Sequence, residues 1–273
     1  MCVAGREHKS AGLHASAILL APTLADNPST RIQLCGQLAV ELDGREITPK
    51  LPGGQARVLF TYLTVTRSRP ASRERLIEAL WPSRAPAGAD TALSALLSRL
   101  RTALGANVLC GRSELTLRLP ADAWIDLEAA EEAIHRAEAA VAQGEWARGW
   151  GPSLVAMFTA RRGFLHDQDL PWADEFRARL TEIHIASLEC YAAVCLGVGG
   201  SELAQGEHAA RELIALAPYR ERGHAVLMEI LVARGNQAEA LRVYEQLRQR
   251  LSAELGATPA PELRDLQERL LRR

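Results

Sequence analysis

Residues 90 to 104, DTALSALLSRLRTAL, decide how the first half of the chain folds. Leucines recur in this stretch at i, i+3, i+4, i+7 and i+11, which at 3.6 residues per turn gives one narrow apolar stripe. They are Leu93, Leu96, Leu97, Leu100 and Leu104. The spacing therefore predicts a helix with one buried face.

The opposite face of this helix is short, hydroxyl-bearing and free of acidic residues after Asp90. It carries Thr91, Ala95, Ser98 and Thr102, with Arg99 and Arg101 on its flanks. Short side chains let a backbone approach closely, hydroxyls donate to phosphates or base edges, and guanidinium groups suit phosphate or guanine. Two interpretations fit these residues equally: a DNA recognition helix, or an ordinary amphipathic helix with a small outer face.

The charge of the chain is unevenly distributed. The 273 residues suggest two domains, and the net charge of −1 hides an asymmetry. Residues 31 to 120 contain 13 Arg or Lys against 7 Asp or Glu, whereas residues 121 to 273 contain 17 against 24. A basic first half and an acidic second half indicate that the first half meets a polyanion.

The five cysteines are scattered and form no C-x-x-C pair. An odd number without that spacing argues against a disulfide framework and a zinc site, and favours a reducing cytoplasm. We therefore expect no metal and no cofactor. Cys190 and Cys195 are five positions apart on a predicted helix, so we expect them on different faces and in packing roles.

No apolar run approaches the length needed to span a bilayer, so we expect no membrane contact. The nearest candidate lies between Ala15 and Ala21, after Arg6 and Lys9. A secretory signal would look similar, but His14 interrupts the run. We therefore interpret residues 1–30 as a mobile N-terminal tail, with secretion as the alternative.

Residues 31–120 have the order of elements of a winged-helix domain. Alternating apolar residues in 31–48 predict a small antiparallel sheet. Two helices follow, one ending near Thr66 and one capped by Ser72, and then the leucine-striped helix. Residues 108–119 alternate around Gly111-Arg112-Ser113, which predicts a hairpin with a basic tip. We expect the leucine-rich core of this domain to be complete by Leu119.

Residues 121–273 show only helical patterns, with no strand expected from Trp124 onward. Helices are predicted over 128–143, 171–196, 202–216, 220–233, 237–255 and 261–271, with a loop around residues 149–152. Gly200 and Gly235 close successive hairpins 35 positions apart. This is close to the period of tetratricopeptide repeats, about 34 residues, and predicts an all-α, tetratricopeptide-like helical-repeat domain.

Two resemblances make this assignment more specific. SRERLIEALWP (72–82) and LSRLRTALG (97–105) resemble the second and third helices of response-regulator effector domains. Residues 218–271 resemble the end of the bacterial transcriptional activation domain. Together, 31–271 resemble the actinobacterial antibiotic regulatory protein family of activators. No G-x-x-x-x-G-K-[ST] occurs, so we expect the NTPase and sensor extensions of larger relatives to be absent.

Seven residues are candidate DNA contacts. The second helix offers Arg73 near its N-terminus, where free N–H groups favour a phosphate, although Arg73 and Arg75 are equally compatible with solvated charges. Arg101 lies nearer the leucine stripe, where it can pair with Glu74 or Glu78. The wing, GRSELTL, lacks the Gly-Tyr usual in the family, so Arg112 is assigned by position. The set is Arg73, Thr91, Ser94, Ser98, Arg99, Arg101 and Arg112.

The sequence contains no catalytic motif: H-E-x-x-H, G-x-S-x-G and a phosphate-binding glycine loop are all missing. We therefore expect a non-enzyme. Trp146, Trp150 and Trp172 are interpreted as helix-packing residues, with a ligand groove as the alternative.

The resemblance implies a transcriptional activator that binds promoter repeats in double-stranded DNA as a homodimer and recruits RNA polymerase holoenzyme, for a secondary-metabolite gene cluster. The alternative is a helical-repeat adaptor whose winged domain binds protein. The charge asymmetry favours the first interpretation, and salt-dependent binding to duplex DNA distinguishes the two.

Overall fold

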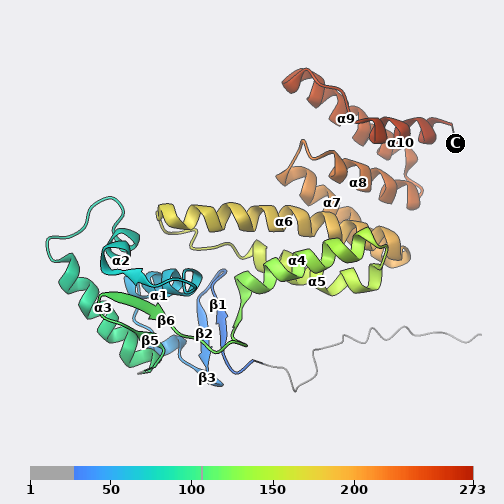
Figure 1. Cartoon of the computed structure of the whole chain (residues 1–273). Coiled ribbons are helices and arrows are strands. Elements are labelled where there is room, and N and C mark those ends of the chain that lie inside the picture. Colours follow the sequence, from blue (N-terminus) through green and yellow to red (C-terminus); the bar gives the residue numbers. More distant parts are fainter. Residues whose placement is uncertain (1–27, 106, 273) are drawn as a thin grey trace, which may run out of the picture.

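The computed structural model describes residues 28–105 and 107–272. Most of the predicted tail, 1–30, lies outside these residues. The fold is mostly helical, with small sheets confined to the N-terminal part (Figure 1). That part contains β1 (Arg31–Gln33), β2 (Ala39–Leu42), β3 (Arg45–Glu46), α1 (Gln55–Val65), β4 (Ala71–Ser72), α2 (Arg73–Leu80), α3 (Ala89–Leu104), β5 (Leu109–Cys110), β6 (Glu114–Leu117) and β7 (Trp124–Ile125), with a short 3₁₀ helix at Thr48–Lys50.

The strands form two sheets. The first has the order β3-β2-β1-β7, in which β1 is antiparallel to β2 and parallel to β7. The second has the order β4-β6-β5 and contains the predicted hairpin. The expectation of no strand from Trp124 onward is wrong, because β7 pairs with β1. A two-residue strand is too short to show an alternating pattern, so only its distant partner identifies it.

The leucine stripe of α3 is buried as predicted. Leu93, Leu97, Leu100 and Leu104 lie in the core, and Leu96 is partly buried against the same cluster. Ser72 caps α2 as expected, with its Oγ accepting from the backbone N–H of Arg75. The sequence pattern thus located the buried faces of the N-terminal helices correctly.

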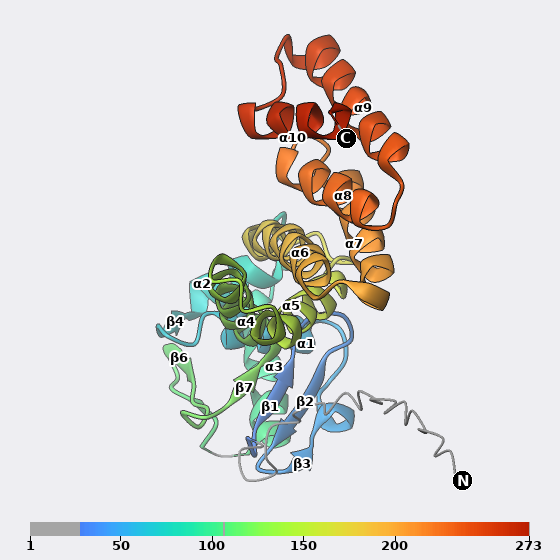
Figure 2. The same ribbon diagram turned by 90° about the vertical axis from the view of Figure 1, so that its right-hand side faces the viewer.

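Beyond β7 the chain forms seven α-helices among the described residues (Figure 2). They are α4 (Asp126–Ala142), α5 (Trp146–Arg161), α6 (Pro171–Val198), α7 (Leu203–Leu216), α8 (Glu221–Ala233), α9 (Gln237–Leu255) and α10 (Pro261–Leu271), with a 3₁₀ turn at Gly200–Glu202 before α7. The predicted bounds of α9 and α10 are confirmed. Gly200 lies between α6 and α7, and Gly235 lies between α8 and α9. Both glycines have positive φ.

The predicted loop at residues 149–152 is wrong, because these residues lie inside α5. Gly149 is buried there, and a Cβ on it would lie only 3.0 Å from a methyl group of Val194 on α6. Ser153 donates its hydroxyl to the Gly149 carbonyl at 2.7 Å, and Pro152 is accommodated in the helix. Close packing against α6 therefore outweighs the low helix propensity of glycine and proline.

The helix α6 is long and apolar enough to cross a membrane, contrary to the expectation from the sequence. Its most apolar 18-residue window has a mean hydropathy of 1.2, and 56% of that window is buried inside the structure. It carries Cys190 in one core cluster and Cys195 in the other, as expected for residues on different faces. Its apolar character is thus used in packing α4 and α5 on one side and α7 and α8 on the other.

Both cysteines of α6 are buried and free. Burial raises the pKa of the Cys190 thiol to about 12 and that of Cys195 to about 11. Because the thiolate is the reactive form, these thiols are poor nucleophiles at neutral pH and act as packing residues.

The three tryptophans of the helical part are packing residues. Trp150 meets Tyr191 edge to face at a centroid distance of 5.4 Å. Trp146 lies so close to Gly197 that a Cβ there would be 2.3 Å from the indole. Trp172 contacts Tyr62 edge to face at 5.0 Å.

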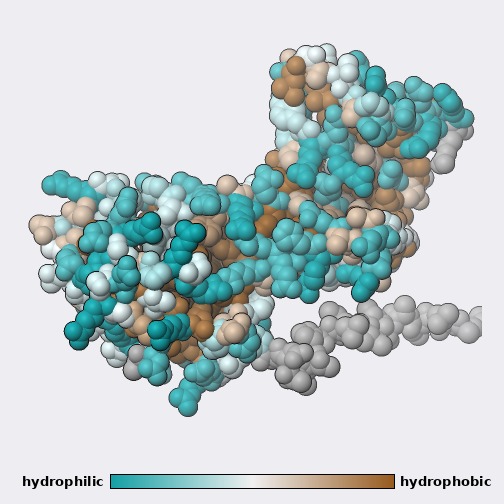
Figure 3. Space-filling view, in the orientation of Figure 1, coloured by the Kyte–Doolittle hydropathy of each residue, from teal (hydrophilic) through white to brown (hydrophobic). Residues whose placement is uncertain are grey.

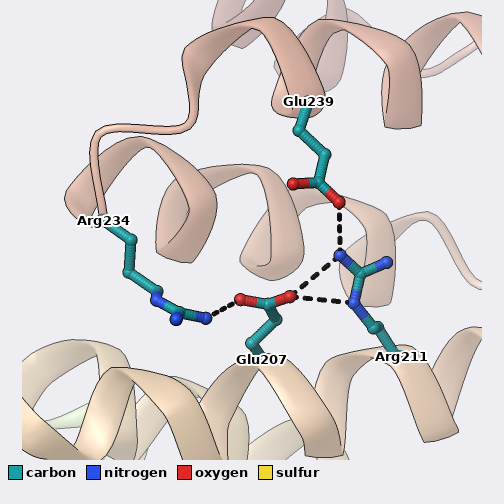
Figure 4. A network of polar contacts seen from close by, with 4 residues as sticks. All are labelled: Glu207, Arg211, Arg234 and Glu239. Atoms are coloured by element: carbon teal, nitrogen blue, oxygen red, sulfur yellow. Dashed lines mark hydrogen bonds and ion pairs between the residues drawn. The ribbon is translucent and has the colours of Figure 1, made fainter.

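An ion-pair network joins the last helical hairpins (Figure 4). Arg211 on α7 reaches Glu207 at 2.9 Å and Glu239 on α9 at 2.6 Å, and Arg234 at the end of α8 also pairs with Glu207. The Glu207 side chain is only 16% exposed. A partly buried network of this kind orients adjacent hairpins more effectively than isolated surface pairs do.

The core continues from the N-terminal part into the helical part, so the expectation that it is complete by Leu119 is wrong. One cluster of buried residues contains Ile32 of β1, Leu93 of α3 and Ile183 of α6. Next to this cluster, the Asp126 carboxylate is fully buried and accepts from the backbone N–H groups of two of its members, Leu34 at 2.8 Å and Cys35 at 3.0 Å.

Further bonds cross the same junction. Gly36 donates its N–H to the Gly163 carbonyl at 2.8 Å, and the Trp172 indole donates to the Ala79 carbonyl at 3.0 Å. Burial raises the pKa of Asp126, although three backbone N–H groups and the nearby Arg162 oppose this rise.

Candidate nucleic-acid interface

The exposed face of α3 lies at the end of the molecule farthest from α9 and α10 (Figure 1). Thr91, Ser94, Ser98 and Arg99 are all exposed on it. The surface at this end is mostly hydrophilic (Figure 3). The helix therefore offers a long polar face that nothing else in the described chain covers.

Arg73 is occupied inside the protein. Its Nε donates to the Asp90 carboxylate at 2.8 Å, and its Nη2 donates to the Ser94 hydroxyl at 2.7 Å. Its side chain is only 23% exposed. Arg73 is therefore neither a solvated charge nor a free cation, and it fixes the start of α3 against α2.

Arg101 is also occupied. Its Nη2 donates to the Gly111 carbonyl at 2.6 Å and its Nε to the Leu109 carbonyl at 3.4 Å. Among the residues that the structure describes, neither Glu74 nor Glu78 is its partner, contrary to the alternative drawn from the sequence. Arg101 therefore connects α3 to the β5–β6 hairpin.

The hairpin tip requires its glycine. Gly111 has φ of +95°, and a Cβ on it would lie 1.8 Å from the carbonyl oxygen of Glu114. Only glycine allows this turn, which leaves Arg112 exposed at the tip. The predicted hairpin with a basic tip is confirmed.

The structure thus divides the seven predicted contact residues into two groups. Within residues 28–105 and 107–272, Arg99 and Arg112 are exposed and have no ion-pair partner. Thr91 and Ser98 are exposed as well. Arg73, Ser94 and Arg101 take part in contacts that position α3 and the hairpin. The exposed Arg84, in the loop before α3, is a further cation that sequence periodicity did not single out.

The two arginines of α3 should differ in their effect on stability. We expect Arg101→Ala to lower the free energy of unfolding by about 1–3 kcal/mol, because it removes charge-assisted hydrogen bonds to two carbonyls. Arg99→Ala should leave stability within about 0.5 kcal/mol, as is usual for an exposed substitution. Urea unfolding of the two variants measures this difference, and equal stability would contradict the assigned role of Arg101.

Comparisons with known proteins identify related molecules. Residues 125–271 match the family model described as the bacterial transcriptional activator domain. The chain is 34% identical over 228 residues to the regulatory protein AfsR of Streptomyces griseus, an alignment that covers 80% of this chain and 22% of AfsR. It is 28% identical to the transcriptional regulatory protein EmbR of Mycobacterium tuberculosis, over 88% of this chain and 62% of EmbR. The chain thus spans less than two thirds of these relatives.

The fold has a counterpart among solved structures. M. tuberculosis EmbR, in complex with a low-affinity phosphopeptide, superposes with a TM-score of 0.73 at 26% identity, over 90% of this chain and 66% of that chain. A mixed α/β part followed by helical hairpins is therefore the fold of a class of transcriptional regulatory proteins. The chain belongs to the actinobacterial antibiotic regulatory protein family, whose members contain the bacterial transcriptional activator domain. The resemblance found in the sequence is confirmed.

Proposed function

We propose that this protein is a sequence-specific DNA-binding transcriptional activator. Residues 31–120 act as a winged-helix domain, with α3 as the recognition helix in the major groove and the β5–β6 hairpin as the wing. Arg99, Arg112, Thr91 and Ser98 contact phosphates and base edges, while Arg73, Ser94 and Arg101 hold these elements in position. The protein requires no cofactor for this and acts in the cytoplasm, where the DNA is.

One observation carries this proposal: within the described residues, the exposed face of α3 carries the unpaired Arg99 and no acidic side chain after Asp90, and the unpaired Arg112 lies at the tip of the neighbouring hairpin. Exposed helices normally mix both signs of charge. A face with only hydroxyl and guanidinium groups is complementary to a phosphate backbone and to base edges.

The helical part serves a different partner. Helices α4 to α10 form tetratricopeptide-like hairpins, and residues 121–273 contain an excess of acidic residues, so this part gains nothing from contact with DNA. Helical-repeat surfaces commonly bind other proteins. We infer that this part contacts RNA polymerase holoenzyme and supports a homodimer on promoter repeats. The names of the matched relatives, regulatory protein AfsR and transcriptional regulatory protein EmbR, favour a role in transcription. We infer from the family resemblance that the genes controlled belong to a secondary-metabolite cluster.

Salt dependence tests the DNA contact directly. The logarithm of the binding constant should fall linearly with the logarithm of salt concentration, by about 0.9 per phosphate contact. Arg99→Ala should make this slope shallower by about one contact, whereas Arg264→Ala, an exposed arginine on α10, should leave it unchanged. Fluorescence anisotropy of the full chain with a labelled duplex provides the measurement. Affinity that is indifferent to salt would favour the adaptor interpretation.

Footprinting on the upstream regions of the protein's own gene cluster identifies the operator. In vitro transcription with polymerase holoenzyme, at promoter occupancy verified by the same footprint, then measures activation. Occupancy without an increase in transcript would leave DNA binding intact and contradict the activating role.

A further inference from the structure

A cleft of about 270 Å³ lies where the N-terminal part meets the helical part. Residues 34–38 and α1 form one side of it, and residues 165–168, between α5 and α6, form the other. Most of the surface accessible in the cleft is apolar. The cleft is separate from the exposed face of α3, and none of its lining residues has a role in the proposed DNA contact.

Arg57 of α1 is a cation without a partner in this cleft. Its Nε atom is buried and makes no hydrogen bond. Within the described part of the chain, no carboxylate pairs with its guanidinium. The first turn of α1 contains no acidic residue, and no side chain caps it. The Arg57 side chain lines the cleft, so an oxygen that entered it would meet a guanidinium that has no acceptor among the described residues.

The opposite wall is held in place. Leu165 has φ of +44°, a left-handed conformation that a leucine rarely adopts. The guanidinium of Arg177 donates to the carbonyls of Phe164 at 3.1 Å, Leu165, and Gln168 at 2.5 Å. Strained backbone persists where surrounding contacts determine it, and this wall is accordingly preformed.

The other charged groups of the cleft lie at its rim. The Asp167 side chain is 83% exposed, and its carboxylate lies 3.3 Å from Nε2 of His166. Because water screens an exposed carboxylate, Asp167 opposes an incoming anion only weakly and leaves the buried Nε of Arg57 unsatisfied.

We propose that this cleft binds a small organic carboxylate. The ligand's carboxylate accepts from N–H groups of the Arg57 guanidinium, and its apolar body packs against Leu34, Leu38, Val58 and Leu165. A phosphate monoester is disfavoured, because it carries about −1.5 to −2 charges and the cleft offers one arginine. At about 30 Å³ for each water-sized group, the cleft accommodates a molecule of about nine non-hydrogen atoms.

This site lies beside the helices that hold the recognition helix. The helix α1 packs against both α2 and α3, and the cleft takes walls from both parts of the chain. A ligand bound there therefore stabilises the junction between them.

Phenylacetate, phenylacetamide and acetate are suitable probes, titrated into the full ¹⁵N-labelled protein without DNA. Phenylacetate should shift the amide signals of residues 34–38 and 165–168, with a Kd on the order of millimolar. Phenylacetamide lacks the charge and acetate lacks the apolar body, so each should bind at least tenfold more weakly. Because no DNA is present, the outcome is independent of the proposed DNA binding.

Variants test whether the Arg57 guanidinium binds the carboxylate. Arg57→Gln should weaken phenylacetate binding at least tenfold, since Gln carries neither the charge nor the terminal N–H groups of the guanidinium. Asp167→Asn should change it by less than about twofold, because water screens that carboxylate, and Arg264→Gln should not change it. If Arg57→Gln fails to fold, the comparisons with phenylacetamide and acetate on the unaltered chain decide the question. Equal affinity for phenylacetate and phenylacetamide, or shifts confined to other residues, would overturn the proposal.

Discussion

Asp126→Ala should lower the free energy of unfolding by about 2–6 kcal/mol, because each buried donor left without an acceptor costs about 1–3 kcal/mol. The donors are the backbone N–H groups of Leu34 and Cys35, which both bond to this fully buried carboxylate. No water can replace the lost acceptor cheaply at a site with no exposed surface. A loss of this size is a large fraction of the stability of a typical domain.

Urea unfolding monitored by circular dichroism measures this effect, with Asp122→Ala as the control. Asp122 is exposed and lies four residues earlier, so the same substitution there should change stability by less than about 0.5 kcal/mol. The free energy of unfolding of Asp126→Asn should lie between those of Asp126→Ala and Asp122→Ala, because an amide retains one acceptor oxygen. Equal stability of the Asp126→Ala and Asp122→Ala proteins would show that the carboxylate is not what joins the two parts.

Ser98→Glu should weaken specific DNA binding by about 10- to 100-fold, because a wrong or repelled contact at a base edge costs about 1–3 kcal/mol. Ser98 is exposed in the middle of α3, on the face opposite the leucine stripe. The new carboxylate would face phosphate or base edges without disturbing the core, so the thermal unfolding curve should stay unchanged.

Ser252→Glu on α9 is the matched control, because it introduces the same charge at an exposed helix position in the acidic part. It should leave operator affinity within about twofold, because α9 lies at the end of the molecule opposite α3 (Figure 1) and salt screens charges that are far apart. A gel-shift titration of both variants compares them. If Ser98→Glu retained full affinity with an intact fold, α3 would not be the recognition helix.

Local spacing determined much of the candidate interface. The leucine stripe of α3 and the alternation around Gly111 follow from the periods of a helix and a strand, which are visible in a few consecutive residues. The same spacing selected the exposed residues Thr91, Ser98, Arg99 and Arg112. Spacing could not show which arginines lack a partner inside the protein, because the partners of Arg101 lie on a different element.

The sequence by itself determined the order of sheet, three helices and hairpin in residues 31–120, the buried face of α3, the bounds of α9 and α10, and the family. Only the tertiary structure decided that α5 continues through Gly149, that β7 joins the first sheet, and that Asp126 accepts from Leu34, 92 positions away. The physical reason is that helix and strand periods are local, whereas close packing and buried hydrogen bonds join residues whose separation in sequence follows no period. The Arg57 cleft belongs to the second kind, since its walls come from segments more than a hundred residues apart.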